Sequence, residues 1–212
     1  MRSVVNQRRY GVLVRNVMFN SEIVTRDVMA KAKTGSFYLT ETVQLPAASA
    51  DGTVVQGTID LGAYVNVPTG QAVAIESVDF ISQVTSANSP DVANMLQTNG
   101  SLGFQLTDLN PGTVLVRADD HSLVASGGLN IDVTNNIATH TNDLYPDNFG
   151  PSSLSEAFMV VNDSLYLCVA NYGAVTNATS EVSLTARIKC RVVKLGTKDW
   201  MAIAIQSTAS DN

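Results

Sequence analysis

The clearest structural signal in the chain is residues 181–193, which read E-V-S-L-T-A-R-I-K-C-R-V-V. Apolar and polar residues alternate without a break from Glu181 to Val192, and successive side chains of a β-strand point to opposite faces of its sheet. The stretch therefore predicts a strand with one buried face and one solvated face. At ~3.3 Å per residue it would span about 40 Å, which is long for a globular protein.

The solvated face of this strand carries three cations in a row, Arg187, Lys189 and Arg191. Like charges two residues apart on one strand face repel each other. An acidic neighbouring strand or a polyanionic partner would relieve the repulsion, and a solvated face without a partner is the alternative. We expect these three side chains to lie on an inward or partner-facing side of the protein.

Shorter runs of the same alternation, separated by turn residues, fill most of the remaining chain. Asn110-Pro111-Gly112 and Gly127-Gly128 are typical turn sequences and predict connections between paired strands. Residues 164–172 are apolar on both faces, which predicts a strand in the middle of a sheet, and residues 135–155 predict a long polar loop. The predicted strands are 37–45, 58–67, 73–84 with a β-bulge near Ser77, 102–109, 113–118, 122–126, 129–133, 157–161 and 164–172.

For two stretches, one near each end of the chain, the sequence is compatible with either a helix or a strand. Over residues 21–34, Ser21 is a suitable N-cap and favours a short helix that ends at Gly35, whereas several β-branched residues argue against it. Over residues 197–206, Thr197 could cap a last helix, although the apolar run that follows would also suit a final strand.

Short strands separated by turns, without the rhythm of alternating strands and helices, predict an all-β protein with one domain. We expect about nine or ten strands in a β-sandwich or a barrel-like jelly roll. The predicted division of the chain is a basic N-terminal arm over 1–35, the jelly-roll β-sandwich over 36–206 and a polar C-terminal tail over 207–212.

Charge is divided along the sequence, although the net charge is only −6. Residues 1–33 hold seven cations and two carboxylates, and residues 187–212 hold five cations and two carboxylates. Residues 34–186 hold a single cation, Arg117, and fifteen carboxylates. This division predicts a molecule with a basic side and an acidic side. Charged residues make up only 15% of the chain, which suits a protein largely covered by copies of itself.

The sequence contains no recognisable catalytic or cofactor-binding motif. Its two histidines, His121 and His140, do not form a metal-binding pair, and neither a nucleotide-binding loop nor a nucleophile motif is present. We therefore expect no enzyme activity, no catalytic residue, no cofactor, no metal site and no small-molecule substrate. A cation site at Asp119-Asp120-His121 is the alternative to a solvated loop there.

The two cysteines, Cys168 and Cys190, both lie in strand patterns. They are expected to be buried thiols, with a cross-strand disulfide as the alternative. Residues 1–20 contain arginines throughout and no apolar core, so we expect no secretory signal peptide.

In this arrangement the chain resembles the single jelly-roll capsid proteins of icosahedral viruses. The features are the arm M-R-S-V-V-N-Q-R-R-Y, the strand series over 37–192, and the ending A-R-I-K-C-R-V-V-K-L-G-T-K-D-W. The resemblance implies a β-sandwich of eight main strands, assembly of many copies into a shell, and a basic arm that faces the genome or an inner membrane. The arm departs from the family pattern, because it holds only four arginines in its first fifteen residues. Contact with anionic lipid, or with an acidic face of a neighbouring subunit, therefore suits the arm as well as contact with nucleic acid.

The predicted function is that of a self-assembling major coat protein, made in the host cytoplasm and located in the virion, with copies of itself and other capsid proteins as partners. Its basic arm and last long strand would face the genome, a membrane or neighbouring subunits. The alternative is a non-catalytic carbohydrate-binding or adhesin-type β-sandwich, lectin-like or from a phage tail or fibre, in which aromatic side chains stack on a sugar. The residues assigned to the first function are Arg2, Arg8, Arg9, Arg15, Arg187, Lys189 and Arg191, and those assigned to the alternative are Tyr145, Phe149 and Tyr172.

Overall fold

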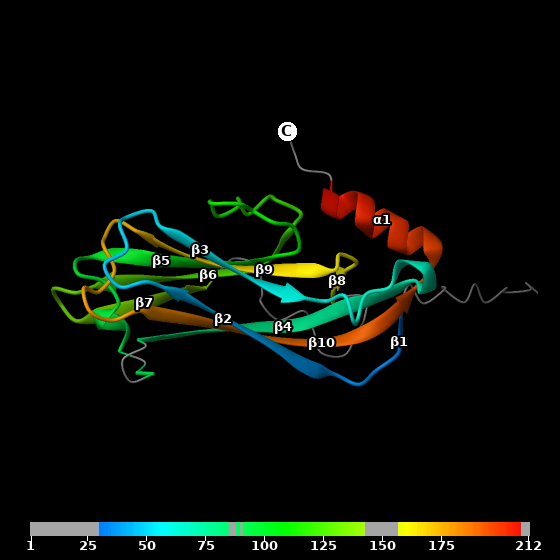
Figure 1. Ribbon diagram of the computed structural model, residues 1–212, viewed down its shortest axis with the longest axis horizontal. Helices are drawn as coiled ribbons and strands as arrows, with labels where there is room; N and C mark the ends of the chain where they lie inside the picture. The colour runs from blue at the N-terminus through cyan, green and yellow to red at the C-terminus, as the bar shows by residue number, and fades with distance from the viewer. Residues whose placement is uncertain (1–29, 85–87, 90, 143–156, 209–212) are drawn as a thin grey trace, which may run out of the picture.

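The computed structural model describes residues 30–84, 88–89, 91–142 and 157–208, which form two packed β-sheets with a helix at one end (Figure 1). We call the sheets the β10 sheet and the β9 sheet after one strand of each. The β10 sheet consists of β1 (Ala30–Ala32), β2 (Phe37–Leu45), β4 (Gln71–Val84), β8 (Phe158–Val160) and β10 (Val182–Leu195). The β9 sheet consists of β3 (Val54–Asp60), β5 (Gly100–Thr107), β6 (Leu123–Asp132), β7 (Ile137–Asn142) and β9 (Ser164–Tyr172). Two 3₁₀ helices, Val67–Thr69 and Val92–Asn94, lie in loops, and α1 (Thr197–Thr208) follows β10.

The strands pair in a nested order. β2 pairs with β10, β3 with β9, β4 with β8, and β5 with β6, all antiparallel. Successive pairs alternate between the two sheets, so the chain is one long hairpin rolled into a sandwich. This is the topology of a single jelly roll, and the predicted all-β fold is confirmed. β1 extends the β2 edge of β10, and β7 extends the β9 sheet beyond β6.

β10 is the strand predicted from the opening alternation, and it is hydrogen-bonded along both edges. β2 and then β1 lie along one edge, and β4 lies along the other. Between β1 and β2, the Thr34 hydroxyl accepts a hydrogen bond of 3.0 Å from the backbone N–H of Val192, so the pairing is almost continuous. The alternating side chains Val182, Leu184, Ala186, Ile188 and Cys190 are buried between the sheets.

The predicted hairpin at Asn110-Pro111-Gly112 is wrong, because residues 113–118 do not form a strand. β5 instead pairs with β6 on one side and with β9 on the other. The Gln105 side chain takes the place of a strand partner for this segment. Its amide donates to the Val116 carbonyl and accepts from the Val116 N–H, both at 2.8 Å.

The predicted turn at Gly127-Gly128 is also wrong, because β6 runs straight through both glycines. A side chain at Gly127 has no room, since a Cβ atom there would lie 2.5 Å from Cε2 of the buried Phe104 ring. The glycine allows an aromatic ring on the neighbouring strand to lie against the backbone, which turn statistics do not reveal.

The strand predicted over 58–67 is placed too late in the chain, since β3 begins at Val54 and ends at Asp60. After Asp60 the chain turns: the Asp60 carboxylate accepts from the N–H of Gly62, and the Leu61 carbonyl accepts from Tyr64 and Val65. The predicted polar loop 135–155 is wrong at its start, where β7 forms, and residues 143–156 lie outside the described residues. The predicted strands 157–161 and 164–172 correspond to β8 and β9, which lie in different sheets.

The two ambiguous ends adopt different structures. Within the helix favoured over 21–34, Ala30–Ala32 is instead strand β1, paired with Val193–Leu195, and residues 21–29 lie outside the described residues. At the other end α1 is a helix, with Asp199 in its first turn where the helix dipole favours a negative charge. None of the described helices has the length and apolar character needed to cross a bilayer.

Replacing Gly127 with alanine is expected to lower the free energy of unfolding by about 2 kcal/mol, because the new methyl group overlaps the Phe104 ring in a closely packed core. Gly35→Ala is the matched control, since nothing lies within 4 Å of a Cβ atom at Gly35. Chemical denaturation of both variants measures the difference. Equal stability of the two variants would show that the core accommodates the methyl group.

Candidate assembly surface

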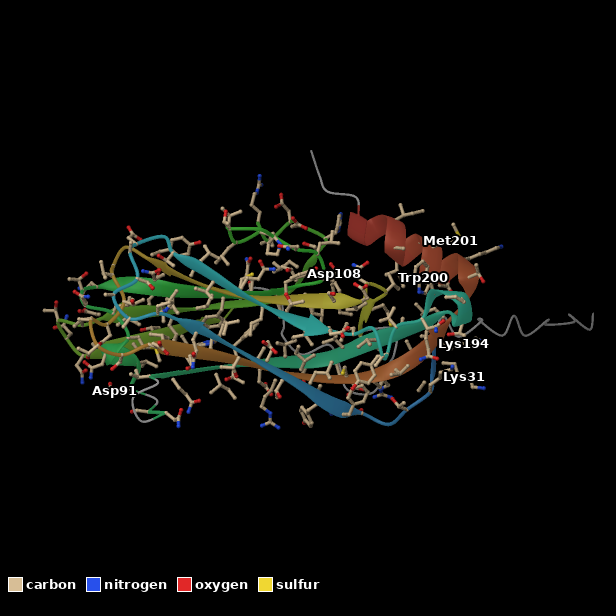
Figure 2. All side chains as sticks on the ribbon, viewed as in Figure 1. Lys31, Asp91, Asp108, Lys194, Trp200 and Met201 are labelled. Carbon is tan, nitrogen blue, oxygen red and sulfur yellow. The ribbon has the colours of Figure 1, made fainter. Side chains whose placement is uncertain are left out.

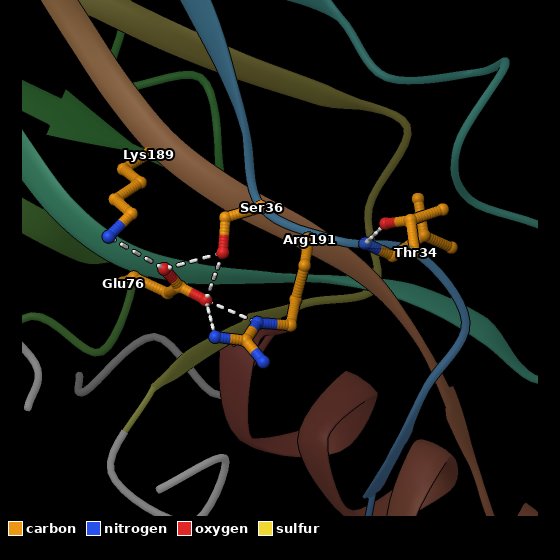
Figure 3. A network of polar contacts seen from close by, with 6 residues as sticks. Thr34, Ser36, Glu76, Lys189 and Arg191 are labelled. Carbon is orange, nitrogen blue, oxygen red and sulfur yellow. Dashed lines mark hydrogen bonds and ion pairs between the residues drawn. The ribbon is translucent and has the colours of Figure 1, made fainter. Parts of the chain in front are cut away.

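Arg187, Lys189 and Arg191 of β10 lie on the outer face of the β10 sheet, the side away from the β9 sheet. Two of them contact Glu76 of β4 (Figure 3). Arg191 contacts the Glu76 carboxylate through both Nε and Nη2, and Lys189 Nζ lies 3.5 Å from Oε2. Arg187 instead stacks on the exposed Tyr38 ring, with its guanidinium carbon 4.8 Å from the ring centre. An acidic neighbouring strand, one of the two predicted partners, therefore meets Lys189 and Arg191 within the chain.

Glu76 reaches this face because β4 contains a β-bulge. Lys189 pairs with Ser77 whereas Cys190 pairs with Ile75, so Glu76 is the extra residue. The bulge keeps Ile75 on the core side while Glu76 points outward. The bulge predicted near Ser77 is confirmed to within one residue, although the sequence did not indicate Glu76 as the partner of the cations.

Glu76 is a nearly buried carboxylate, with only 4% of its surface exposed. The Ser36 hydroxyl lies 3.0 Å from both carboxylate oxygens and donates a hydrogen bond to the group. Burial raises the pKa of Glu76, but the hydrogen bonds from Arg191 and Ser36 and the charges of Arg191 and Lys189 together outweigh it and hold the pKa below its usual range. Glu76 is therefore ionised at neutral pH and fixes both cations on the sheet.

Replacing Glu76 with glutamine is expected to lower the free energy of unfolding at pH 7 by about 2 kcal/mol, because two partly buried cations lose their counter-ion. A depressed carboxyl pKa stabilises the fold above the pKa of the unfolded chain, and this stabilisation is lost as pH falls through the lower folded pKa. The difference between the variant and the wild type should therefore shrink as pH falls below about 4.

Urea unfolding at pH 7 and pH 3.5 measures this change. Asp119→Asn is the control, since Asp119 pairs with Arg117 at 2.9 Å in an ion pair whose side chains are 62% and 86% exposed. Exposed pairs of this kind contribute little, about 0–1 kcal/mol. If the two variants lose the same stability at pH 7, the contacts of Glu76 with Lys189 and Arg191 stabilise the fold no more than an exposed ion pair does.

Beyond Arg191, α1 covers the outer face of the β10 sheet. Trp200, Ile203 and Ala204 of α1 pack on a second apolar cluster that the strands contribute. The Trp200 Nε1 atom is buried there and has no hydrogen-bond partner among the described residues. The strand residues of the cluster include Ala30, Ala72, Ala74, Val193 and Leu195.

The cations from the two ends of the sequence meet where β1 pairs with β10. Lys31 and Lys194 lie directly opposite each other in the pairing, and both are exposed. Lys33 is beside them and donates to the Gln71 amide oxygen at 2.9 Å. We call Lys31, Lys33 and Lys194 the lysine patch. Its members were counted in the charge of the two ends, but only the strand pairing brings them together.

The opposite end of the molecule is acidic, and we call it the acidic loop end. The connections β2–β3, β4–β5, β6–β7 and β9–β10 contain no lysine or arginine. Strand register places these connections at the same end, and Figure 2 shows Asp91 there, far from Lys31 and Lys194. The described carboxylates of the acidic loop end are Asp51, Asp91, Asp132 and Glu181. The β9-sheet side of the lysine end also carries carboxylates, so the basic character is confined to the lysine patch.

The other predicted site residues are not brought together. Arg2, Arg8, Arg9 and Arg15, and the aromatic residues Tyr145 and Phe149, lie outside the described residues. Tyr172 is described at the end of β9, where it is 41% exposed. Its ring lies over Gly103, and burial raises its pKa. The ring therefore lies partly against the β9 sheet and partly in solvent.

The candidate cation site at residues 119–121 and the two cysteines were the remaining groups that the sequence singled out. Asp119 is paired with Arg117, and no three His, Cys, Asp or Glu side chains of the described residues are grouped closely enough to hold a metal ion. Both cysteines are buried free thiols, as predicted. Burial raises the pKa of Cys168 to about 11, and burial together with the Glu76 charge raises the pKa of Cys190 to about 12.

Asp108, a buried carboxylate that the sequence did not indicate, follows β5 and is 2% exposed. The Asn162 amide donates to its carbonyl at 3.0 Å and to Oδ2 at 3.3 Å, while Oδ1 has no partner among the described residues. Burial raises the pKa of Asp108 to about 7, and the charge of Asp120 acts in the same direction. Hydrogen bonds from its own backbone N–H and from Asn162 act against these two effects.

Because the pKa of Asp108 is higher in the folded chain than in the unfolded chain, its contribution to stability is largest below pH 4 and is lost as pH rises through 7. The wild type is expected to lose about 2 kcal/mol of its free energy of unfolding through Asp108 between pH 5 and pH 8. Asp108→Asn removes this loss, so the variant should be about 2 kcal/mol more stable relative to the wild type at pH 8 than at pH 5. Thermal or urea unfolding at the two pH values tests this, with the exposed Asp163→Asn as the control. A pH profile that Asp108→Asn leaves unchanged would contradict it.

Comparison with known proteins adds distant structural similarity. No protein-family model matches the chain, and no curated protein matches it in sequence. Among solved structures, the chain is similar to a chain in the cryo-electron-microscopy structure of Mud Crab Dicistrovirus, with 11% sequence identity and a TM-score of 0.35. The similarity covers 92% of this chain and 81% of that chain. The jelly-roll fold is assigned from the nested strand pairing.

Proposed function

We propose that this chain is a major coat protein of an icosahedral virus and assembles with copies of itself into a shell. The observation that carries the proposal is the separation of the acidic loop end from the lysine patch on one β-sandwich (Figure 2). An acidic end and a basic patch at the opposite end allow a neighbouring copy to meet its complement, which favours ordered self-association over random contact.

The outer face of the β10 sheet supports the same proposal. Its described side chains include an exposed Tyr38 and the partly exposed Ile81, and Thr42 and Thr185 lie side by side with their hydroxyl oxygens 2.8 Å apart. Glu76 neutralises cations on this face within the chain. A β-sheet face with little uncompensated charge and exposed apolar groups can approach another copy without a large electrostatic cost.

The proposal also includes a non-catalytic role, residence in the virion, contact with other capsid proteins, and an inward-facing basic arm. The arginines of residues 1–20 precede β1, which contributes Lys31 to the lysine patch, so the arm and the patch are joined in the chain. Such a basic surface suits an anionic partner inside the shell, either a genome or a membrane.

Light scattering and negative-stain microscopy of the purified chain, across salt and protein concentration, test the assembly. Shells, tubes or rings are expected at low salt, where charge complementarity is strongest. Asp91→Lys with Glu181→Lys should raise the concentration needed for assembly about tenfold, because charged interface groups contribute roughly 0.7 kcal/mol each. Lys31→Glu with Lys194→Glu in the same chain should restore it.

Asp119→Lys with Asp163→Lys is the matched control, because it makes the same two charge reversals at exposed loop residues outside the acidic loop end. A monomer at every condition, or variants that assemble as the wild type does, would count against assembly through these two ends.

A further inference from the structure

On the outer face of the β10 sheet, one cation and one carboxylate have no ionic partner among the described residues. Glu76 neutralises Lys189 and Arg191 there. Arg187 and Asp79 are both exposed on the same face, and neither forms an ion pair within the part of the chain that the structure describes. The face therefore presents one unneutralised charge of each sign, on two neighbouring strands.

The register of the sheet would allow these two charges to pair within the chain. Arg187 of β10 lies directly opposite Asp79 of β4, a position in which opposite charges ordinarily stabilise a sheet. The guanidinium instead lies over Tyr38 of β2, on the other edge of β10, with its central carbon 4.8 Å from the ring centre. Stacking on the ring holds the guanidinium in place and leaves the N–H groups at its rim able to donate to a partner.

Apolar surface surrounds the two charges. Tyr38 is 54% exposed and Ile81 of β4 is 39% exposed, both on strands that lie side by side with β10 (Figure 1). Tyrosine and arginine are enriched among the residues that contribute most to binding between proteins. We call Tyr38, Asp79, Ile81 and Arg187 the Arg187 patch. Its chemistry suits a protein surface that offers a carboxylate to Arg187 and a cation to Asp79.

We propose that the Arg187 patch binds the same patch of a second copy of this chain across a two-fold axis. In a two-fold contact each surface meets itself, so a contact between Arg187 of one copy and Asp79 of the other forms twice. An axis that runs along the sheet between β4 and β10 exchanges these two strands between the copies and brings each cation to a carboxylate. One patch supplies both signs of charge, so a second copy satisfies it completely.

This inference rests on the proposed self-association and adds a second kind of contact to it. Contact between the acidic loop end and the lysine patch joins two different surfaces, and contacts of that kind build rings or filaments. A closed shell also needs contacts that join one ring to the next. A two-fold contact between identical patches supplies them.

A sugar and a nucleic acid fit the Arg187 patch less well than a second copy does. A sugar stacks on the open face of an aromatic ring, whereas Arg187 already covers one face of Tyr38. The phosphates of a nucleic acid would be attracted to Arg187 but repelled by Asp79 on the next strand. A second copy gives both charges and the apolar Ile81 a role.

Sedimentation velocity of the full-length chain, at concentrations below the onset of particle assembly, measures the dimer. The wild type is expected to dimerise in this range. Arg187→Asp and Asp79→Arg should each raise the dimer dissociation constant at least about tenfold, because each reversal places like charges opposite each other twice in the dimer. An equimolar mixture of the two variants should restore the dimer, since one chain then carries two carboxylates and the other two guanidinium groups.

Two further sets of variants act as controls. Arg117→Asp and Asp119→Arg make the same reversals in the exposed ion pair of the β5–β6 loop and should leave the dimer unchanged. Tyr38→Ala should weaken the dimer about tenfold, because an aromatic contact at the centre of an interface is lost. Tyr172→Ala, which removes an exposed tyrosine from the β9 sheet, should not weaken it. Circular dichroism checks that each variant keeps its sheets.

A wild type that stays monomeric over this range, or a mixture of Arg187→Asp and Asp79→Arg that stays monomeric, would overturn the proposal. Oligosaccharide binding by a monomeric wild type, lost in Tyr38→Ala, would assign the patch to a sugar instead. Microscopy scores particles separately. Normal shells from Arg187→Asp chains would overturn the two-fold contact and leave the coat-protein function standing, whereas a charge-dependent dimer without shells would support the contact and count against that function.

Discussion

The pairing of β10 along both of its edges is the constraint on which the rest of the structure depends. It joins the first strands of the sandwich to the last, and the other pairs are nested inside it. Its side chains alternate strictly between the core and the outer face, so a slip of one residue would place Arg187 and its neighbours in the core. The same alternation that buries Ile188 therefore also fixes where the cations lie.

The bulge at Glu76 shows how a local irregularity serves both faces of the β10 sheet. One extra residue in β4 keeps Ile75 and Val78 in the core and directs a carboxylate to the outer face. There it satisfies Lys189 and Arg191, which would otherwise repel each other two residues apart. The cations beyond this point are not satisfied in the same way, and they belong to the end of the molecule where β1, β10 and α1 meet.

This distribution of charge connects the fold to its proposed roles. The acidic loop end is made by connections that all leave the sandwich at one end, and the lysine patch is made by the two termini of the described chain at the other. A jelly roll separates these groups because nested pairing sends alternate connections to opposite ends. Self-assembly would use the acidic loop end together with the lysine patch.

The sequence by itself determined the strands whose two faces differ in environment. β2 was predicted with its observed bounds, β10 to within two residues and β4 with its bulge, because half-buried strands keep the period of two that burial imposes on composition. Only the tertiary structure decided what Gly127 and Gln105 do. Gly127 lies beside a buried ring, but a pair of glycines in a sequence predicts a turn. The Gln105 amide hydrogen-bonds to the backbone of a loop, and such a contact leaves no periodic pattern in the sequence. The opposition of Lys31 to Lys194 and the burial of Asp108 were likewise decided by contacts between segments far apart in the chain, which no local pattern encodes.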